Sequence, residues 1–81
     1  MLSPSREDLI RTVYVWQMRL PLETNRAIAG RFLANGVIDL LNRGQRKHVI
    51  ERYLIKQKLT LGKDVLGVIE EICLLLVDME E

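Results

Sequence analysis

The segment DVLGVIEEICLLLVDM, residues 64–79, has the clearest helical pattern in this chain. At 100° per residue on a helical wheel, most of its apolar side chains fall on one arc of about 200°, and acidic side chains occupy most of the remainder. A helix at the surface of a monomer usually has a narrower apolar stripe, of roughly 100°. We therefore expect this helix to be covered from two sides. The arc consists of Val65, Leu66, Val68, Ile69, Ile72, Cys73, Leu75, Leu76, Val77 and Met79.

Two arrangements would cover such a helix. Either the rest of the chain covers one side and another polypeptide covers the other, or the chain wraps the helix completely. We expect the first arrangement, because 81 residues provide little material for wrapping. The expected interface on this helix is Leu66, Ile69, Cys73, Leu76 and Val77.

Three further helices are expected before this one. Ser5 lies after Pro4 and three residues before Asp8, which is typical of a helix start. Pro21 ends this first helix, because the residue before a proline avoids helical angles. Its apolar face is Leu9, Val13, Trp16 and Leu20.

The second helix is expected to begin after Thr24 as its N-cap and to stop before Gly44. Asn35-Gly36 could break it, but we expect it to continue through this pair. One face carries small residues that would let another helix approach closely: Ala27, Gly30 and Ala34. Ile28 and Phe32 project from the other side, and they form a second candidate protein interface unless they are tucked beneath the first helix or the loop around Pro21.

The third helix is expected from Gln45 to Leu59 and the fourth from Asp64, as its N-cap, to Met79. No segment has the alternating pattern of a β-strand. The sequence thus predicts an all-α fold with a single domain over residues 1–81, a small bundle of about four short helices completed by oligomerisation.

Residue counts exclude the usual covalent supports of a small domain. Cys73 is the only cysteine and His48 the only histidine, so an internal disulfide and a structural zinc site are both excluded. We interpret Cys73 as a small buried hydrophobic residue in a reducing compartment. The support that remains is association with another chain.

The chain also lacks the patterns of an enzyme. The carboxylates of Glu70-Glu71 and Glu80-Glu81 are adjacent in sequence, so they diverge by about 100° on a helix and do not form an acid–base pair. Gly62-Lys63-Asp64 lacks the preceding glycines of a phosphate loop. We expect no catalytic residue, no cofactor, no metal and no small-molecule substrate.

No segment is typical of a membrane protein. The longest apolar run, ICLLLV at residues 72–77, is too short to span a bilayer. The start, MLSPSRED, lacks the apolar core of a secretory signal. We expect a cytoplasmic protein that does not contact a membrane.

Charge is distributed unevenly along the chain. Residues 42–63 carry seven Lys and Arg against one Glu, a net charge of +6, whereas residues 64–81 carry six acidic residues and no base. The most basic stretch is RGQRKHVIERYLIKQK, residues 43–58. On a helical wheel one of its flanks is neutralised around Glu51, and the other, which we call the basic edge, contains no acid. The basic edge is Arg43, Arg46, His48, Arg52 and Lys56.

Three interpretations of the basic edge remain open. An antiparallel pair of the third and fourth helices would bring Arg52 and Lys56 near Glu70-Glu71, within one chain or across a dimer. The edge could also be merely solvated, or it could follow the phosphates of a nucleic acid. A helix-turn-helix is disfavoured, because the fourth helix would offer apolar and acidic side chains to the bases.

The function we expect is that of a small, non-enzymatic protein–protein interaction module. It would be a homodimeric regulatory or adaptor protein, or a subunit of a larger complex, with the fourth helix in the interface. The alternative is a nucleic-acid-binding regulator that uses the basic edge.

Overall fold

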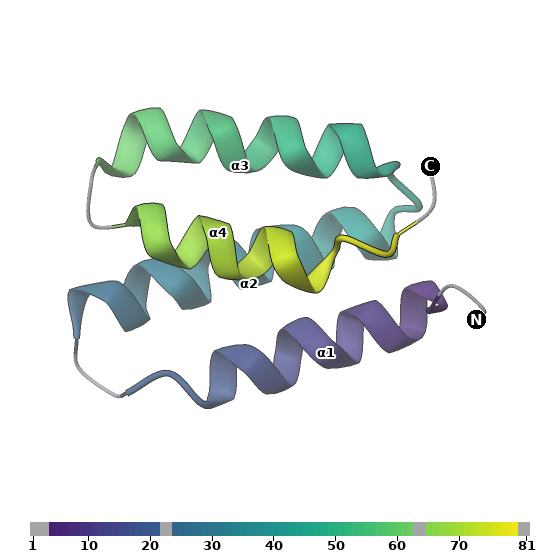
Figure 1. The fold of residues 1–81 in the computed structure, drawn as a ribbon, viewed down its shortest axis with the longest axis horizontal. Helices are drawn as coiled ribbons and strands as arrows, with labels where there is room; N and C mark the ends of the chain where they lie inside the picture. Colours follow the sequence, from purple (N-terminus) through teal and green to yellow (C-terminus); the bar gives the residue numbers. More distant parts are fainter. Residues whose placement is uncertain (1–3, 22–23, 63–64, 80–81) are drawn as a thin grey trace.

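The computed structural model describes residues 4–21, 24–62 and 65–79, apart from the side chain of Leu66. Within these ranges the chain forms four helices and no strand. The prediction of an all-α bundle of four short helices is therefore confirmed (Figure 1). The helices are α1 (Arg6–Met18), α2 (Asn25–Asn42), α3 (Lys47–Leu61) and α4 (Leu66–Leu75).

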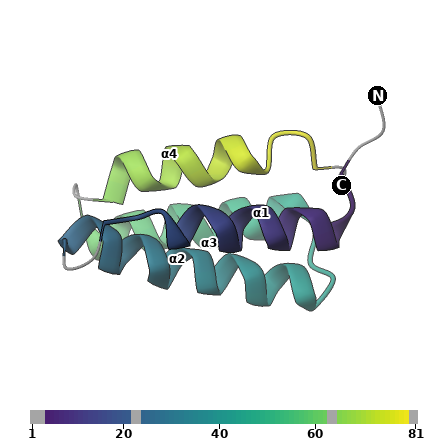
Figure 2. The same ribbon diagram turned by 90° about the horizontal axis from the view of Figure 1, so that it is seen from below.

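Successive helices run antiparallel, and the bundle has two central helices and two lateral ones. α2 and α4 lie one behind the other between α1 and α3 (Figure 1). Seen from below, α4 and α2 lie on opposite sides of the bundle (Figure 2). Each of them contacts the other three helices. One side of α4 is thus covered by its own chain, and its other side faces outward.

The first two helices begin at the predicted caps. The Asp8 amide donates to the Ser5 hydroxyl at 3.2 Å, and the Ser5 amide donates to the Asp8 carboxylate at 3.3 Å. This reciprocal pair satisfies two backbone donors that a helix start would otherwise leave unpaired. In the same way, the Ala27 amide donates to the Thr24 hydroxyl at 3.0 Å. Each such cap contributes about 0.5–2 kcal/mol to helix stability.

Glycines end the second and third helices. Gly44 has φ +77° and Gly62 has φ +83°, a left-handed backbone that residues with a Cβ rarely adopt. α2 continues through Asn35-Gly36 as predicted. α3 begins and ends two residues later than predicted, at Lys47 and Leu61 instead of Gln45 and Leu59.

Two glycines within α2 allow its neighbours to approach closely. A Cβ on Gly36 would overlap the phenol oxygen of Tyr53 from α3. A Cβ on Gly30 would lie 2.6 Å from a methyl of Leu20, next to Trp16 of α1. Ala27, Gly30 and Ala34 are all buried, as the predicted small-residue face requires.

All four helices, together with the segments that flank α4, supply the core. Its largest fully buried side chains are Val13, Leu33, Val37, Leu41, Ile50, Leu54, Val65, Val68, Ile72 and Leu76. Each contributes about 1.5–3 kcal/mol by leaving water.

The end of α4 differs from the prediction. The sequence pattern extends the helix to Met79, but it ends at Leu75 and a turn follows. The Met79 amide donates to the Leu76 carbonyl at 3.0 Å, and the Met79 side chain returns to the core. The ammonium of Lys47 donates to the Val77 carbonyl at 3.0 Å. These contacts compensate for the helical hydrogen bonds that the turn gives up. The predicted cap Asp64 lies outside the described residues.

Candidate functional site

The inward side of α4 is not available to a partner. Ile69 and Leu76 were expected in a protein interface, but they are only 8% and 1% exposed and lie in the core. α1, α2 and α3 all contact this side of the helix, so the chain's own packing covers it. The expectation is corrected for these two residues. The side chain of Leu66, a third expected interface residue, lies outside the described part of the structure.

The outward side of α4 carries an apolar surface. Val77 is 58% exposed and Cys73 is also exposed, so both remain candidates for an interface. Leu74 is 70% exposed beside them, and its exposure was not predicted from the sequence. It lies three and four residues after Glu71 and Glu70, on the arc that the wheel assigns to acidic residues. An apolar residue within a polar arc was the signal that could have identified it.

Gly67 completes this surface at the other end of α4. It is exposed, and a Cβ built on it would meet no atom within 4 Å. Unlike Gly30 and Gly36, it is not required to be small by any described neighbour. We call the surface formed by these residues of α4, together with Val77 of the turn that follows it, the outer face of α4: Gly67, Glu70, Cys73, Leu74 and Val77.

A groove of about 550 Å³ runs between the outer face of α4 and the near side of α3. Apolar side chains from α4 form much of its lining, and Lys47 and Glu51 of α3 border it. Cys73 lies in this groove instead of the core, which corrects the expectation that it is buried. The lining residues are Lys47, Glu51, Ile69, Glu70, Cys73, Leu74 and Val77.

The groove raises the pKa of the Cys73 thiol. Partial burial raises its pKa above the ordinary value, and the negative charges of Glu51 and Glu70 raise the pKa further. Lys47 opposes this effect by lowering the pKa. Because the thiolate is the nucleophilic form, this environment makes Cys73 a poor nucleophile.

The basic edge is exposed throughout: Arg43, Arg46, His48, Arg52 and Lys56 all face solvent. Arg43 pairs with Asp39 of α2 at 3.1 Å. The expected pairing of Arg52 and Lys56 with Glu70-Glu71 within the chain is not observed among the described residues. Glu71 pairs instead with Arg26 of α2 at 2.7 Å. α3 presents to α4 the flank that contains Lys47 and Glu51, so the basic edge is directed away from α4.

Two exposed apolar residues lie within the basic edge. Ile55 is 60% exposed and Leu59 is 83% exposed, and neither was identified from the sequence. At 100° per residue they fall on the same side of α3 as Arg52. We call this surface the outer face of α3: His48, Arg52, Ile55, Lys56 and Leu59. It combines apolar and basic side chains, whereas the outer face of α4 combines apolar and acidic ones.

The second candidate interface, on α2, is also exposed. Ile28 is 60% exposed and Phe32 is 56% exposed, so the alternative in which α1 covers them is wrong. They lie on the opposite side of α2 from Gly30, whose Cα faces Val68 of α4. This pair and the outer face of α4 therefore lie on different sides of the molecule.

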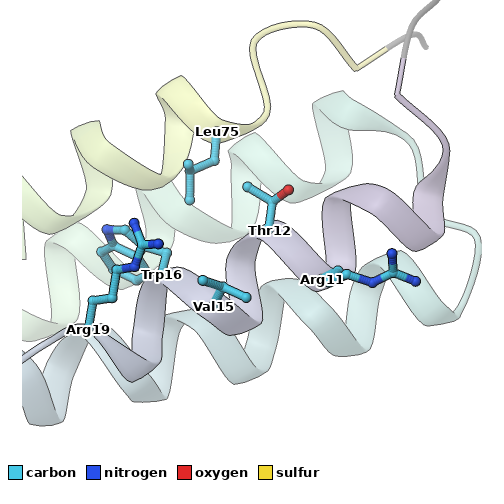
Figure 3. Close-up of a pocket in the computed structure, with 6 residues that line it drawn as sticks. All are labelled: Arg11, Thr12, Val15, Trp16, Arg19 and Leu75. Carbon is cyan, nitrogen blue, oxygen red and sulfur yellow. The ribbon is translucent and has the colours of Figure 1, made fainter.

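A shallow groove of about 360 Å³ separates α1 from α4 (Figure 3). Trp16, Val15 and Leu75 provide its apolar part, and Arg11 and Arg19 lie toward its two ends. Its lining contains no carboxylate, histidine or cysteine that could act in acid–base or nucleophilic chemistry.

Neither metal ligands nor a membrane span are found in the described ranges. Within residues 4–21, 24–62 and 65–79, no three His, Cys, Asp or Glu side chains gather closely enough to hold a metal ion. In the same ranges, no helix combines the length and apolar character needed to cross a bilayer.

Comparison with known proteins found no matching family model, no matching curated sequence and no matching solved structure.

Proposed function

We propose that this chain is a non-enzymatic protein–protein interaction module that forms a homodimer through the outer face of α4 and serves as a regulatory or assembly subunit. The observation that carries the proposal is the exposure of Leu74 and Val77, at 70% and 58%, beside an apolar groove. Contiguous exposed apolar residues on a small protein are typical of an interface.

Energetics require the interface to extend beyond these two residues. Full burial of a leucine or valine contributes about 1.5–3 kcal/mol. Leu74 and Val77 from both copies, at 70% and 58% exposure, would contribute roughly 4–8 kcal/mol in total. Association costs about 4–15 kcal/mol in lost translational and rotational freedom. A stable dimer therefore needs additional apolar contacts, and α3 supplies the neighbouring exposed ones.

The chemistry of the site supports a binding function over catalysis. The Cys73 thiol has a raised pKa, and the carboxylates near it disfavour its ionisation further. Association through this face would leave Ile28 and Phe32 exposed on α2, where a further subunit could bind. The adaptor part of the proposal rests on this second surface.

Measurement of mass in solution tests the proposal. Light scattering should give twice the chain mass of 9.4 kDa at micromolar concentration. Leu74→Glu should give a folded monomer, because it places a charge in the apolar contact. Met18→Glu is the matched control, since Met18 is 68% exposed on α1, and it should remain dimeric. A wild-type protein that stays at 9.4 kDa at micromolar concentration would refute self-association.

Nucleic-acid binding is the second candidate, and the exposure of the whole basic edge favours it. Ile55 and Leu59 count against it, because apolar side chains among the cations would face phosphates. A binder should shift DNA or RNA in a gel at low salt and lose the shift steeply as salt rises. Arg52→Glu combined with Lys56→Glu should abolish the shift. No shift by the wild-type protein at low salt would refute this candidate.

A further inference from the structure

We propose that, in the homodimer, the outer face of α3 of each copy packs on the outer face of α4 of the other, about a two-fold axis parallel to the helices. This inference rests on the proposed self-association and goes further, since it specifies which surfaces meet and in what orientation.

Charge complementarity identifies the second copy as the occupant. Arg52 and Lys56 on α3 form no ion pair within the described part of the chain, and neither does Glu70 on α4. A partner for the outer face of α4 should be apolar and basic, and the outer face of α3 has that composition. The same chain thus carries both halves of a complementary contact, and complementary charge fixes the orientation of partners more than it adds affinity.

Symmetry leaves two ways to stack the faces of an adjacent helix pair. In an isologous dimer, the two-fold axis lies in the plane between the copies. An axis perpendicular to the helices would place α3 on α3 and α4 on α4. Basic side chains would then face basic ones, and acidic side chains would face acidic ones. An axis parallel to the helices places α3 on α4 twice and opposes unlike charges. Only the parallel axis is compatible with the charges of the two outer faces.

The parallel axis also places individual residues opposite one another. Within one copy, Lys47 contacts Val77 and Glu51 lies near Cys73. Moving four residues forward along α3 therefore corresponds to moving four residues back from Val77 towards α4, and this correspondence gives the height of each residue along the bundle. A two-fold axis parallel to the helices does not change the height of a residue along the bundle. Glu70 of one copy therefore lies at a level between Arg52 and Lys56 of the other.

Gly67 fits the same register. By the same correspondence it lies at a level between Ile55 and Leu59 of the second copy. Glycine inside a helix costs about 1 kcal/mol relative to alanine. No described atom of its own chain lies within 4 Å of a Cβ at this position, so the monomer does not require glycine there. In the dimer, Leu59 of the second copy, which is 83% exposed in the monomer, approaches this position closely and leaves room only for glycine.

The molecule is large enough for such a contact. The bundle is 35 Å along its longest axis, so a contact along α3 and α4 can extend over several helical turns. α3 and α4 together form one long side of the bundle, and two such sides would meet as a bundle of four antiparallel helices (Figure 1).

Exchanging charges between the two faces tests the arrangement. One variant carries Arg52→Glu and Lys56→Glu, and a second carries Glu70→Lys and Asp78→Lys, where Asp78 is an exposed residue of the turn after α4. The second variant leaves the Arg26–Glu71 pair intact. Sedimentation equilibrium should show that each variant alone dimerises at least about tenfold more weakly than the wild type, because like charges now face each other. A chain that carries all four changes should regain the wild-type dissociation constant to within about threefold.

The two single-face variants separate the two axes. Under the parallel axis each of them places like charges opposite each other, so dimerisation weakens, and the four-fold variant restores it. Under the perpendicular axis like charges already face each other in the wild type, so each single-face variant exchanges one like-charged contact for another and dimerises about as tightly as the wild type, a result that would overturn the arrangement. Failure of the four-fold variant to dimerise would overturn the arrangement, provided that circular dichroism and Trp16 fluorescence show it folded. If it does not fold, an equimolar mixture of the wild type and the Arg52→Glu/Lys56→Glu variant decides: heterodimers tighter than the wild-type homodimer would overturn the parallel axis, and weaker ones would support it.

A matched control removes the effect of net charge. Arg11→Glu combined with Arg19→Glu makes the same change of charge as Arg52→Glu with Lys56→Glu, but on the exposed side of α1 and at the residue that caps its end, and it should leave dimerisation unchanged. The two proposals fail separately. A monomeric wild type defeats self-association and this arrangement together, whereas a dimeric wild type without rescue by the four-fold variant defeats only the arrangement.

Discussion

The two sides of α4 have similar side chains and opposite surroundings. The inward side carries Val68, Ile72 and Leu76, which are at most 1% exposed, whereas the outward side carries Leu74 and Val77, which are 70% and 58% exposed. Both sides are apolar, so hydropathy does not distinguish a core residue from an interface residue. The arrangement of α1, α2 and α3 makes the distinction, because those helices reach only one side.

The largest expected effect contrasts Ile72 with Leu74. Ile72→Ala should lower the free energy of unfolding by about 2–5 kcal/mol, because it removes buried methyl groups and leaves a cavity. Leu74→Ala should change the free energy of unfolding by no more than about 0.5 kcal/mol, because Leu74 has few contacts within the chain. Urea denaturation followed by circular dichroism, at a concentration where the protein is monomeric, measures both. Equal destabilisation by the two variants would contradict the assignment of the two sides.

The contrast between packed and open positions extends to the glycines, and Gly36 has the next largest effect. An added methyl would collide with Tyr53, and overpacking of this kind costs about 1–3 kcal/mol. Alanine returns about 1 kcal/mol of helix propensity, so Gly36→Ala should lower the free energy of unfolding by up to about 2 kcal/mol.

A double-mutant cycle checks the cause of this loss. In a Tyr53→Phe background the phenol oxygen is absent, so Gly36→Ala should be less destabilising there. The same loss in both backgrounds would show that Tyr53 is not the neighbour that requires glycine.

Gly67 should respond in the opposite direction. Gly67→Ala adds a methyl where no described atom lies within 4 Å, so the monomer should gain up to about 1 kcal/mol in the free energy of unfolding. Dimerisation should weaken, because the methyl separates α4 from Leu59 of the second copy. Urea denaturation at low concentration measures the first effect and sedimentation the second. A variant that gains stability and dimerises as tightly as the wild type would remove Gly67 from the interface.

The smallest expected effect is on the reactivity of Cys73, at the border between the two sides. Its pKa lies above the ordinary value, so at pH 8 less of it is thiolate than in an unfolded peptide, and iodoacetamide should alkylate it more slowly. Glu70→Gln removes a charge that raises this pKa, so alkylation should become faster. Lys47→Gln removes a charge that lowers it, so alkylation should become slower. The reverse order of the two variants would show that Cys73 does not face these residues.

Much of the fold could be predicted because it depends on local rules. The Ser5 and Thr24 caps, the stop at Gly44 and the continuity of α2 through Asn35-Gly36 each involve residues a few positions apart. The end of α4 was predicted too late, because the turn after Leu75 is held by Lys47, a residue 30 positions from Val77. A pattern confined to α4 does not contain that contact.

The candidate site was predicted only in part. Ile28, Phe32, Cys73 and Val77 are exposed as an interface requires, but Ile69 and Leu76 are buried in the core. Leu74, Ile55 and Leu59 were missed because the wheel places them among charged residues, where an apolar side chain attracts little notice. Assigning each apolar residue to the core or to the surface needs the positions of the other helices.

Local sequence patterns alone specify that this protein is helical, where its first two helices begin, and that its most basic segment is followed by its most acidic one. Which half of the apolar arc of α4 is core depends on the tertiary fold, and so does the absence of an ion pair between Arg52 or Lys56 of α3 and the acidic residues of the same chain within the described ranges. The two kinds of interaction differ in how far apart along the chain the interacting residues lie. Helix formation depends on hydrogen bonds between residues four apart, whereas burial and ion pairing depend on which distant segments pack against a side chain.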